Sequence, residues 1–177
     1  MPTSRPSRHF AGCSVSELHV TFVCSGNICR SPMAEKMFAH QIAERGLRDV
    51  VRVTSAGTGS WHAGDGADER ACLVLADRGY PTAHRAAVVD DDHLSADLVV
   101  AMGRNHARIL ADLGVEPDRL RMLRSFDPRA GAHTPDVEDP YYGTRDDFEA
   151  VFEVIEAALP GLHDWVDEAL AARGIVA

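Results

Sequence analysis

One short segment holds a nucleophile and a cation at a spacing that could bind and attack an anion. Cys24 and Arg30 are separated by five residues, among them Gly26 and Asn27, two types that tolerate unusual backbone angles. Such a loop can turn its backbone N–H groups toward one point and cradle a phosphate-sized anion. Arg30 can add two parallel hydrogen bonds, which a lysine could not. Cys24 would then be placed to attack phosphorus and form a phosphocysteine.

The strand and the helix on either side of this loop should place it in a positive electrostatic field that favours bound anions. Residues 18–23 form a short β-branched run that ends directly at Cys24, and Pro32 stands at a plausible first helical position. A helix N-terminus favours an anion, so the same field should stabilise a thiolate at Cys24, and Ser31 could donate a hydrogen bond to its sulfur. The alternative is a buried structural cysteine in an ordinary turn. The strand before the loop and the Ser-Pro after it disfavour that alternative.

Hydrophobic patterning along the rest of the chain predicts alternating strands and helices. The expected strands are 18–23, 50–54 (with 55–57 as its exit), 97–102 and 120–123. The expected helices are 32–45, 68–78, 105–113, 146–159 and 162–172, and Pro160-Gly161 should break or bend the chain between the last two. This order predicts one α/β domain, a four-stranded parallel sheet with helices on both faces. The loop after the first strand lies where such folds bind ligands.

The composition sets the class of protein and excludes several kinds of partner. With 27 acidic against 18 basic side chains in 177 residues, a single soluble domain fits, and a general nucleic-acid binder does not. No run approaches the roughly 18 apolar residues of a membrane span. The four cysteines form no paired CxxC units, so we expect neither a metal centre nor a disulfide framework, and reduced thiols favour a cytoplasmic setting. Residues 1–17 have no apolar core and are predicted to be a disordered leader before a domain at 18–173.

Four separated segments resemble the low-molecular-weight protein tyrosine phosphatases of bacterial type. The resemblance runs from about residue 19 to 170 and rests on VCSGNICRSPMAE at 23–35, Thr54-Ser-Ala-Gly57, Thr82-Ala-His84 and Asp139-Pro-Tyr-Tyr-Gly143. It implies hydrolysis of phosphotyrosine through a phosphocysteine on Cys24, with Arg30 binding the phosphate and no cofactor. The implied partners are phosphotyrosine-containing proteins, and the implied inhibitors are inorganic phosphate and similar oxyanions. Some bacterial relatives leave the cell without a classical signal, which is compatible with this chain.

The resemblance also assigns residues that would meet the substrate. Asp139 matches the general acid, which later helps water to attack the phosphocysteine. Asp127, also before a proline, is the rival, and a turn-forming role is preferred for it. Trp61, Tyr141 and Tyr142 match the walls and rim of a slot deep enough for a phenyl phosphate, although one tyrosine could merely anchor its loop. His62 is expected to be exposed.

Other matched positions belong to the loop itself or support it. The predicted phosphate-binding loop contains Ser25, Gly26, Asn27, Ile28, Cys29 and Ser31, and Ser55 and His84 match residues that hydrogen-bond with Asn27 to hold its shape. In the family, Cys29 and Cys24 can form a protective disulfide, and a small buried side chain is the alternative for Cys29. Cys13 and Cys72 are interpreted as uninvolved. Many relatives carry Asp where this chain has Gly103, which predicts different fine tuning around the loop.

Two other functions compete with hydrolysis. Arsenate reductases use the same fold and a similar loop, but their chemistry needs further cysteines downstream, and here only Cys72 follows Cys29. A silent phosphate-binding module would usually have lost either Cys24 or Asp139, and both are present. A nucleotide-binding P-loop is excluded because no GxxxxGK[ST] string occurs.

Overall fold

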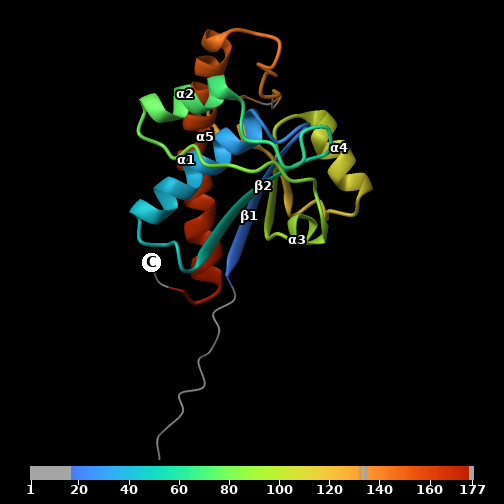
Figure 1. The fold of residues 1–177 in the computed structure, drawn as a ribbon. Coiled ribbons are helices and arrows are strands. Elements are labelled where there is room, and N and C mark those ends of the chain that lie inside the picture. The colour runs from blue at the N-terminus through green and yellow to red at the C-terminus, as the bar shows by residue number, and fades with distance from the viewer. Residues whose placement is uncertain (1–16, 132, 134, 176–177) are drawn as a thin grey trace, which may run out of the picture.

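Four parallel strands form one sheet in the order β2-β1-β3-β4. The structure is a computed structural model that describes residues 17–131, 133 and 135–175. Its strands are β1 (Leu18–Cys24), β2 (Val51–Gly57), β3 (Leu98–Ala101) and β4 (Leu120–Met122). Its helices are α1 (Arg30–Glu44), α2 (Glu69–Asp77), α3 (Asp91–Leu94), α4 (Arg104–Asp112), the 3₁₀ helix η1 (Leu123–Phe126) and α5 (Arg145–Ala172), as labelled in Figure 1. The predicted α/β fold is confirmed; the predicted leader lies outside the described residues except for Glu17.

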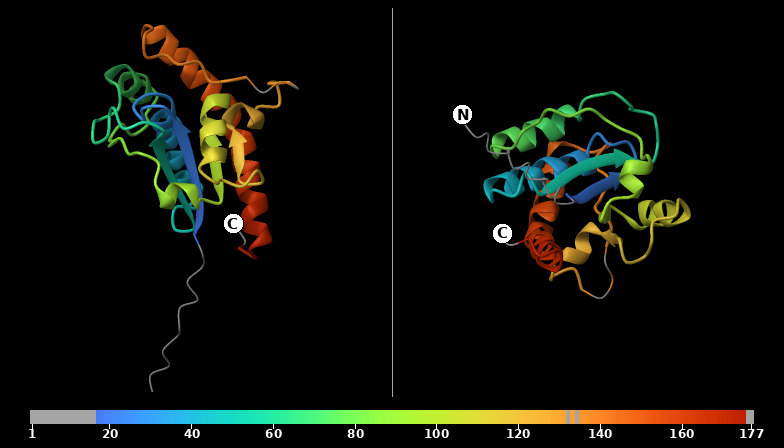
Figure 2. Two further views of the ribbon diagram at one scale, coloured as in Figure 1. Left: turned by 90° about the vertical axis from the view of Figure 1, so that its right-hand side faces the viewer. Right: turned by 90° about the horizontal axis from the view of Figure 1, so that it is seen from below.

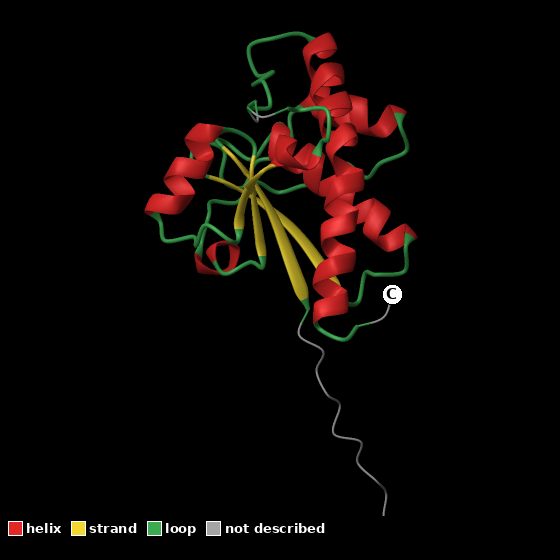
Figure 3. Cartoon of the chain, turned by 180° about the vertical axis from the view of Figure 1, so that it is seen from behind, coloured by secondary structure: helices red, strands yellow, loops and turns green. Residues whose placement is uncertain are grey.

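Helices cover both faces of the sheet. Helices α1, α2 and α5 lie on one side, and α3 and α4 lie on the other (Figure 3). The side chains of β1 alternate between these layers: Val20 and Phe22 are buried in the large apolar cluster with α1 and α5, whereas Val23 packs with Leu110 of α4 in a smaller cluster. A parallel sheet buried on both faces requires apolar side chains on both, which explains why β3 is a continuous apolar run.

Several element boundaries differ from the sequence prediction. Strand β2 does not end at residue 54, because residues 55–57 continue to pair with Phe22–Cys24 of β1. Helix α1 begins at Arg30, so Pro32 is its third residue rather than its first. A proline is tolerated there because the first four N–H groups of a helix have no intrahelical acceptor. Helices α3 and η1 were not predicted, because they have four residues each and show no readable periodicity in the sequence.

Helix α5 runs through Pro160 without a break. It is one helix of 28 residues, and Figure 2 shows its orange and red parts running in different directions, so the predicted interruption takes the form of a bend. Gly161 has a packing role at this point, because a Cβ there would lie 2.3 Å from the carbonyl oxygen of Phe126. Over the described part of the chain, no helix has both the length and the apolar character that a membrane span needs.

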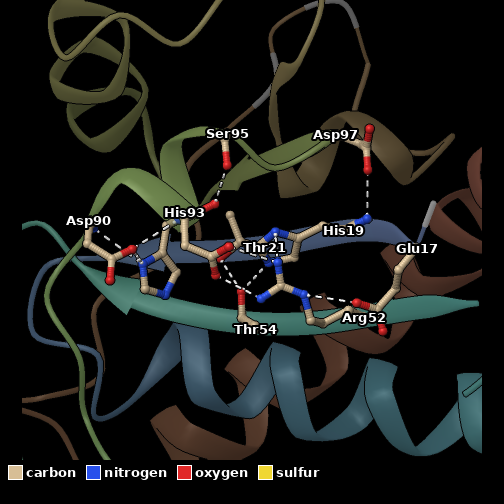
Figure 4. Close-up of polar contacts among 10 residues, drawn as sticks. Glu17, His19, Thr21, Arg52, Thr54, Asp90, His93, Ser95 and Asp97 are labelled. Carbon is tan, nitrogen blue, oxygen red and sulfur yellow. Dashed lines mark hydrogen bonds and ion pairs between the residues drawn. The ribbon is translucent and has the colours of Figure 1, made fainter. Parts of the chain in front are cut away.

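A polar cluster around the buried His19 lies between β1, β2 and α3, on the face of the sheet opposite α1 (Figure 4). The Nη2 atom of Arg52 lies 3.0 Å from Nδ1 of His19, and Nε2 of His19 lies 2.7 Å from Oγ1 of Thr54. Since a guanidinium can only donate, Nδ1 accepts, and the neutral ring donates through Nε2. Asp92 receives two hydrogen bonds from the same arginine. Burial and the neighbouring Arg52 lower the pKa of His19 to about 4.

This histidine predicts how stability depends on pH. In the unfolded chain a histidine binds a proton below pH ~6.5, whereas His19 in the folded protein binds one only near pH 4. The unfolded state therefore binds more protons between these values, and stability falls as the pH drops from about 6.5 toward 4. We expect His19→Gln to recover about 1–2 kcal/mol of the loss between pH 7 and pH 5. Urea unfolding at both pH values measures this, and the exposed His133→Gln is the control; equal pH dependence in all three proteins would contradict it.

Candidate active site

A cavity of about 420 Å³ opens at the carboxyl end of β1, against the N-terminus of α1. It lies at the junction that the sequence predicted for the loop between the first strand and the first helix. Its lining combines loop residues, two aromatic loops and a carboxylate: Cys24, Ser25, Gly26, Ile28, Cys29, Arg30, Trp61, His62, Asp139, Tyr141 and Tyr142. Segments that lie more than 100 residues apart in the sequence therefore line the same cavity.

Cys24 and Arg30 close the two ends of the loop. The Sγ atom of Cys24 is buried and lies 2.9 Å from Oγ of Ser31. Arg30 donates through Nη1 to the carbonyl of Val137 at 3.1 Å, and its Nη2 lies 3.3 Å from Oδ2 of Asp139. The Nε atom of Arg30 is buried and has no hydrogen-bond partner among the described residues. A buried guanidinium donor without a partner is costly, so this atom is suited to an oxyanion in the cavity.

Asn27 holds the loop in a conformation that side chains rarely adopt. Its φ of +56° is the one positive value among the described residues other than glycine. The Nδ2 atom of Asn27 donates to Ser31 and to Ser55, each at 2.8 Å, and its Oδ1 accepts from the backbone of Ala87 at 2.9 Å. His84 donates through Nε2 to the Asn27 carbonyl at 2.7 Å. The contacts predicted for Ser55 and His84 are therefore present, and four hydrogen bonds offset the backbone strain.

Glu35, which was given no role from the sequence, ends this network. Ser55 donates a hydrogen bond to its carboxylate, and Nδ1 of His84 lies 3.7 Å from the same oxygen. Because Ser31 accepts from Asn27, its own hydrogen is available to the sulfur of Cys24. Asn27 thus donates to two hydroxyls, of which Ser55 donates on to Glu35 and Ser31 lies against the sulfur of Cys24. The sequence signal that could have identified Glu35 is its position in the loop motif, five residues after Arg30.

Gly57 leaves room for the loop. A Cβ on this residue would lie 2.7 Å from the carbonyl oxygen of Ser25 and 3.1 Å from the carbonyl carbon of Gly26, both backbone atoms. We expect Gly57→Ala to displace the loop and to lower kcat/KM toward an aryl phosphate about 10- to 100-fold, since misplacing reacting groups by about 1 Å costs this much. Gly66→Ala, where no atom lies within 4 Å, is the matched control. Equal activity of the two variants would show that the loop adapts.

The segment carrying Asp139 is tied to the body of the protein by a residue that sequence reasoning missed. Arg70 donates to the carbonyls of Gly143 at 2.8 Å and Tyr141 at 2.9 Å, and Asp68 pairs with it at 2.8 Å. Asp139 itself is half-exposed, and its Oδ1 accepts from the backbone of Tyr141 at 3.2 Å. The rival Asp127 does not line the cavity; it accepts from the backbone of Arg129 at 2.9 Å in a turn.

Aromatic side chains form the rim of the cavity. The side chains of Trp61 and Tyr142 are 75% and 96% exposed, so neither serves the core. Tyr141 is less exposed, and its ring lies 4.9 Å from that of Tyr142 and 6.1 Å from that of His62. His62 was expected only to be exposed, yet it lines the cavity and lies against the loop, since a Cβ on Gly26 would be 3.0 Å from its ring.

Two further loop residues, Cys29 and Ser25, also line the cavity. Burial and the charge of Asp68 raise the pKa of Cys29 to about 12, so its thiol stays protonated at neutral pH. The redox pairing with Cys24 stays a prediction. Ser25 is 2.8 Å from Nε2 of the buried His106, whose pKa falls to about 4 through burial and the nearby Arg30. Nothing in the sequence pattern singled out His106.

Comparison with known proteins places this geometry in a family. A low-molecular-weight protein-tyrosine phosphatase A of Mycobacterium tuberculosis is 72% identical over 157 residues, which are 89% of this chain and 96% of that protein. A crystal structure of a protein tyrosine phosphatase from Entamoeba histolytica matches with a TM-score of 0.79 at 31% identity, covering 86% of this chain and 99% of that one. The arginine phosphatase YwlE of Bacillus subtilis, in a mutant with a phosphorylated active-site serine, matches with a TM-score of 0.75 at 32% identity, covering 85% and 96%.

The profile of one protein family covers nearly all of the described domain. The family described as low molecular weight phosphotyrosine protein phosphatase matches residues 19–172, which include every helix and strand bound given above except Leu18. That match and the identity to the mycobacterial protein agree with each other. This chain therefore belongs to the low-molecular-weight protein-tyrosine phosphatases and is an enzyme of that family.

Proposed function

We propose that this enzyme hydrolyses phosphotyrosine in proteins through a phosphocysteine on Cys24. One observation carries the proposal. Cys24, Arg30 and Asp139 all line one cavity of about 420 Å³, and the Nε of Arg30 has no hydrogen-bond partner among the described residues. The loop supplies backbone donors, and the α1 N-terminus adds a positive field, so a phosphate dianion can be bound with its phosphorus above the sulfur. The same groups should make inorganic phosphate and similar oxyanions competitive inhibitors.

The first step transfers the phosphoryl group to the protein. The Cys24 thiolate attacks phosphorus, an S–P bond forms, and the bond between phosphorus and the tyrosine oxygen breaks. Arg30 and the loop amides stabilise the charge on the equatorial oxygens. Asp139 gives its proton to the departing tyrosine oxygen, because a phenoxide is a poor leaving group.

The second step restores the enzyme. Asp139, now a carboxylate, accepts a proton from water as that water attacks phosphorus. The S–P bond breaks, inorganic phosphate leaves, and the Cys24 thiolate is regenerated. The hydrogen bond from Ser31, polarised by the Asn27, Ser55 and Glu35 chain, stabilises the sulfur as it departs.

The aromatic rim supports tyrosine as the phosphorylated residue. A flat phenyl ring can stack between Trp61 and Tyr141, whereas phosphoserine is too short to fill the same depth. The mycobacterial relative is named a tyrosine phosphatase, but the neighbour YwlE is named an arginine phosphatase. Phosphoarginine is therefore the substrate against which phosphotyrosine must be tested.

The test uses one peptide sequence carrying phosphotyrosine, phosphoserine or phosphoarginine at the same position. We expect kcat/KM for the phosphotyrosine peptide to exceed that of the other two at least 100-fold. Acid-quenched turnover, followed by mass spectrometry, should find the phosphoryl group on the peptide that contains Cys24. A preference for phosphoarginine would overturn the substrate, and turnover without a covalent adduct would overturn the mechanism.

A further inference from the structure

We infer that Asp136 is a positioning residue for Asp139, and that it acts by fastening the acid-bearing segment to the N-terminus of α4. The inference rests on the proposed role of Asp139 as the general acid. Asp136 lies three residues before Asp139 and does not line the cavity that contains Cys24, although it lines a neighbouring cavity of about 320 Å³ together with Arg30 and Asp139. Its carboxylate bonds to Arg104, so we infer that its effect on Asp139 passes through the backbone between the two residues.

Asp136 provides the cap that α4 lacks in its own sequence. The residue before this helix is Gly103, which has no side chain with which to cap it. The Oδ1 atom of Asp136 accepts instead from the backbone N–H of Arg104 at 3.0 Å, and the Nε of Arg104 lies 3.3 Å from the same oxygen. A carboxylate at a helix N-terminus is stabilised both by the free N–H groups and by the helix dipole. The cap comes from a segment 32 residues away in sequence.

The absence of a side chain on Gly103 makes this arrangement possible. A Cβ built on Gly103 would lie 3.2 Å from Cγ and 3.3 Å from Oδ2 of Asp136, closer than most real contacts. The backbone of Gly103 is extended, with φ −161°, so any residue could adopt its conformation. The requirement is for space, and the space is occupied by the Asp136 carboxylate.

The segment between Asp136 and Asp139 is then held from two further sides. The N–H of Val137 donates to the carbonyl of Met102 at 2.8 Å, next to the start of α4. The carbonyl of Val137 accepts from Nη1 of Arg30 at 3.1 Å. Asp136 thus anchors the first residue of the segment 136–139, and the last residue, Asp139, pairs with Arg30. Releasing Asp136 should let the Asp139 carboxyl drift while Cys24 and the phosphate loop stay in place.

The distinguishing measurement is how the first step depends on the leaving group. Phenyl phosphate needs a proton from the general acid, because phenoxide is strongly basic, whereas para-nitrophenolate leaves with little help. The ratio of kcat/KM for para-nitrophenyl phosphate to that for phenyl phosphate therefore reports how well the acid is placed. Damage to the fold or to the phosphate loop lowers both values together and leaves the ratio unchanged.

We expect Asp136→Ala to lower kcat/KM about tenfold for phenyl phosphate and only about twofold for para-nitrophenyl phosphate. The inhibition constant of inorganic phosphate should change by less than about twofold, because the cradle is untouched. Gly103→Ala keeps the carboxylate but crowds it, and it should raise the same ratio by a smaller factor. Asp90→Ala is the matched control, because Asp90 caps α3 through the backbone of His93 at 3.1 Å and lies outside the cavity.

Asp139→Ala separates the inference from the proposal on which it rests. It should raise the ratio most, with a loss of about 100-fold on phenyl phosphate. If Asp139→Ala leaves the ratio unchanged, the assignment of the acid is wrong, and the inference fails with it. If Asp139→Ala raises the ratio and Asp136→Ala does not, or does so no more than Asp90→Ala, the inference alone is overturned.

Discussion

Cys24→Ser should abolish turnover of phosphotyrosine peptides, with a loss on the order of 10⁴-fold or more in kcat. The hydroxyl is a far weaker nucleophile than a thiolate, and neither Ser31 nor the α1 N-terminus can ionise it at neutral pH. The cradle should still bind its anion, because Arg30 and the backbone of the loop are unchanged. A discontinuous phosphate assay with a phosphotyrosine peptide measures the loss, and the inhibition constant of phosphate for the wild type is compared with its dissociation constant for the variant.

The control for this variant is a cysteine outside the loop. Cys72 lies in α2 outside the cavity, and Cys72→Ser should keep full activity. Persistent activity in Cys24→Ser, with the folded circular dichroism of the wild type, would show that another group attacks phosphorus. If Cys24→Ser lost phosphate binding as well as activity, the substitution would have opened the loop, and the loss of activity could not be assigned to the sulfur. Cys24→Ala is then the second variant, and we expect it to retain phosphate binding while losing activity.

The phosphate loop and the sheet could be predicted because their causes are local. A β-branched run, a glycine and an asparagine, and a proline early in the next helix are all visible within residues 18–32. The alternation of strands and helices also predicted a parallel sheet with helices on both faces, whereas the strand order and the face that each helix covers came from the structure. The length of β2 was underestimated because Ser55 and Gly57 are poor strand formers that pairing with β1 overrides.

The supporting residues escaped prediction because their contacts are made across the fold. Arg70, His106 and Asp136 each touch a segment more than 30 residues away, and no motif spacing encodes those contacts. Each is also of a type that occurs often, so its presence in the sequence carries little information. Gly103 did stand out in the sequence analysis as a departure from related proteins, but only the structure relates it to the Asp136 carboxylate that fills its space.

The site has two parts: a buried phosphate-binding loop, and a more exposed rim that carries Asp139 and the tyrosines. Cys24, Asn27 and Ser31 are buried and joined by a continuous hydrogen-bond network. Asp139 and the rim tyrosines are half-exposed or exposed and are held mainly by backbone contacts from Arg70 and Arg30. This division suits an enzyme that must bind one constant group, the phosphate, with a fixed geometry while admitting different protein surfaces around it.

Arg30→Lys should lower kcat/KM for phosphotyrosine peptides about 10³-fold, although the formal charge is conserved. Arg30 uses Nη1 for the Val137 carbonyl and Nη2 for Asp139, and it still has a buried Nε to offer to a phosphate oxygen. An ammonium group is one point at the end of a flexible chain and cannot serve these three directions together. The acid segment and the phosphate should therefore both lose their fixed positions.

The measurement must separate this geometric loss from unfolding. Arg45→Lys is the matched control, because Arg45 pairs with Asp167 on the surface, and it should leave kcat/KM within about twofold. The inhibition constant of phosphate should rise in Arg30→Lys, whereas it should hardly change in the Asp136 variants. If Arg30→Lys retained most of its activity, charge alone would suffice at this position, and the planar two-point contact with the phosphoryl oxygens would have to be abandoned.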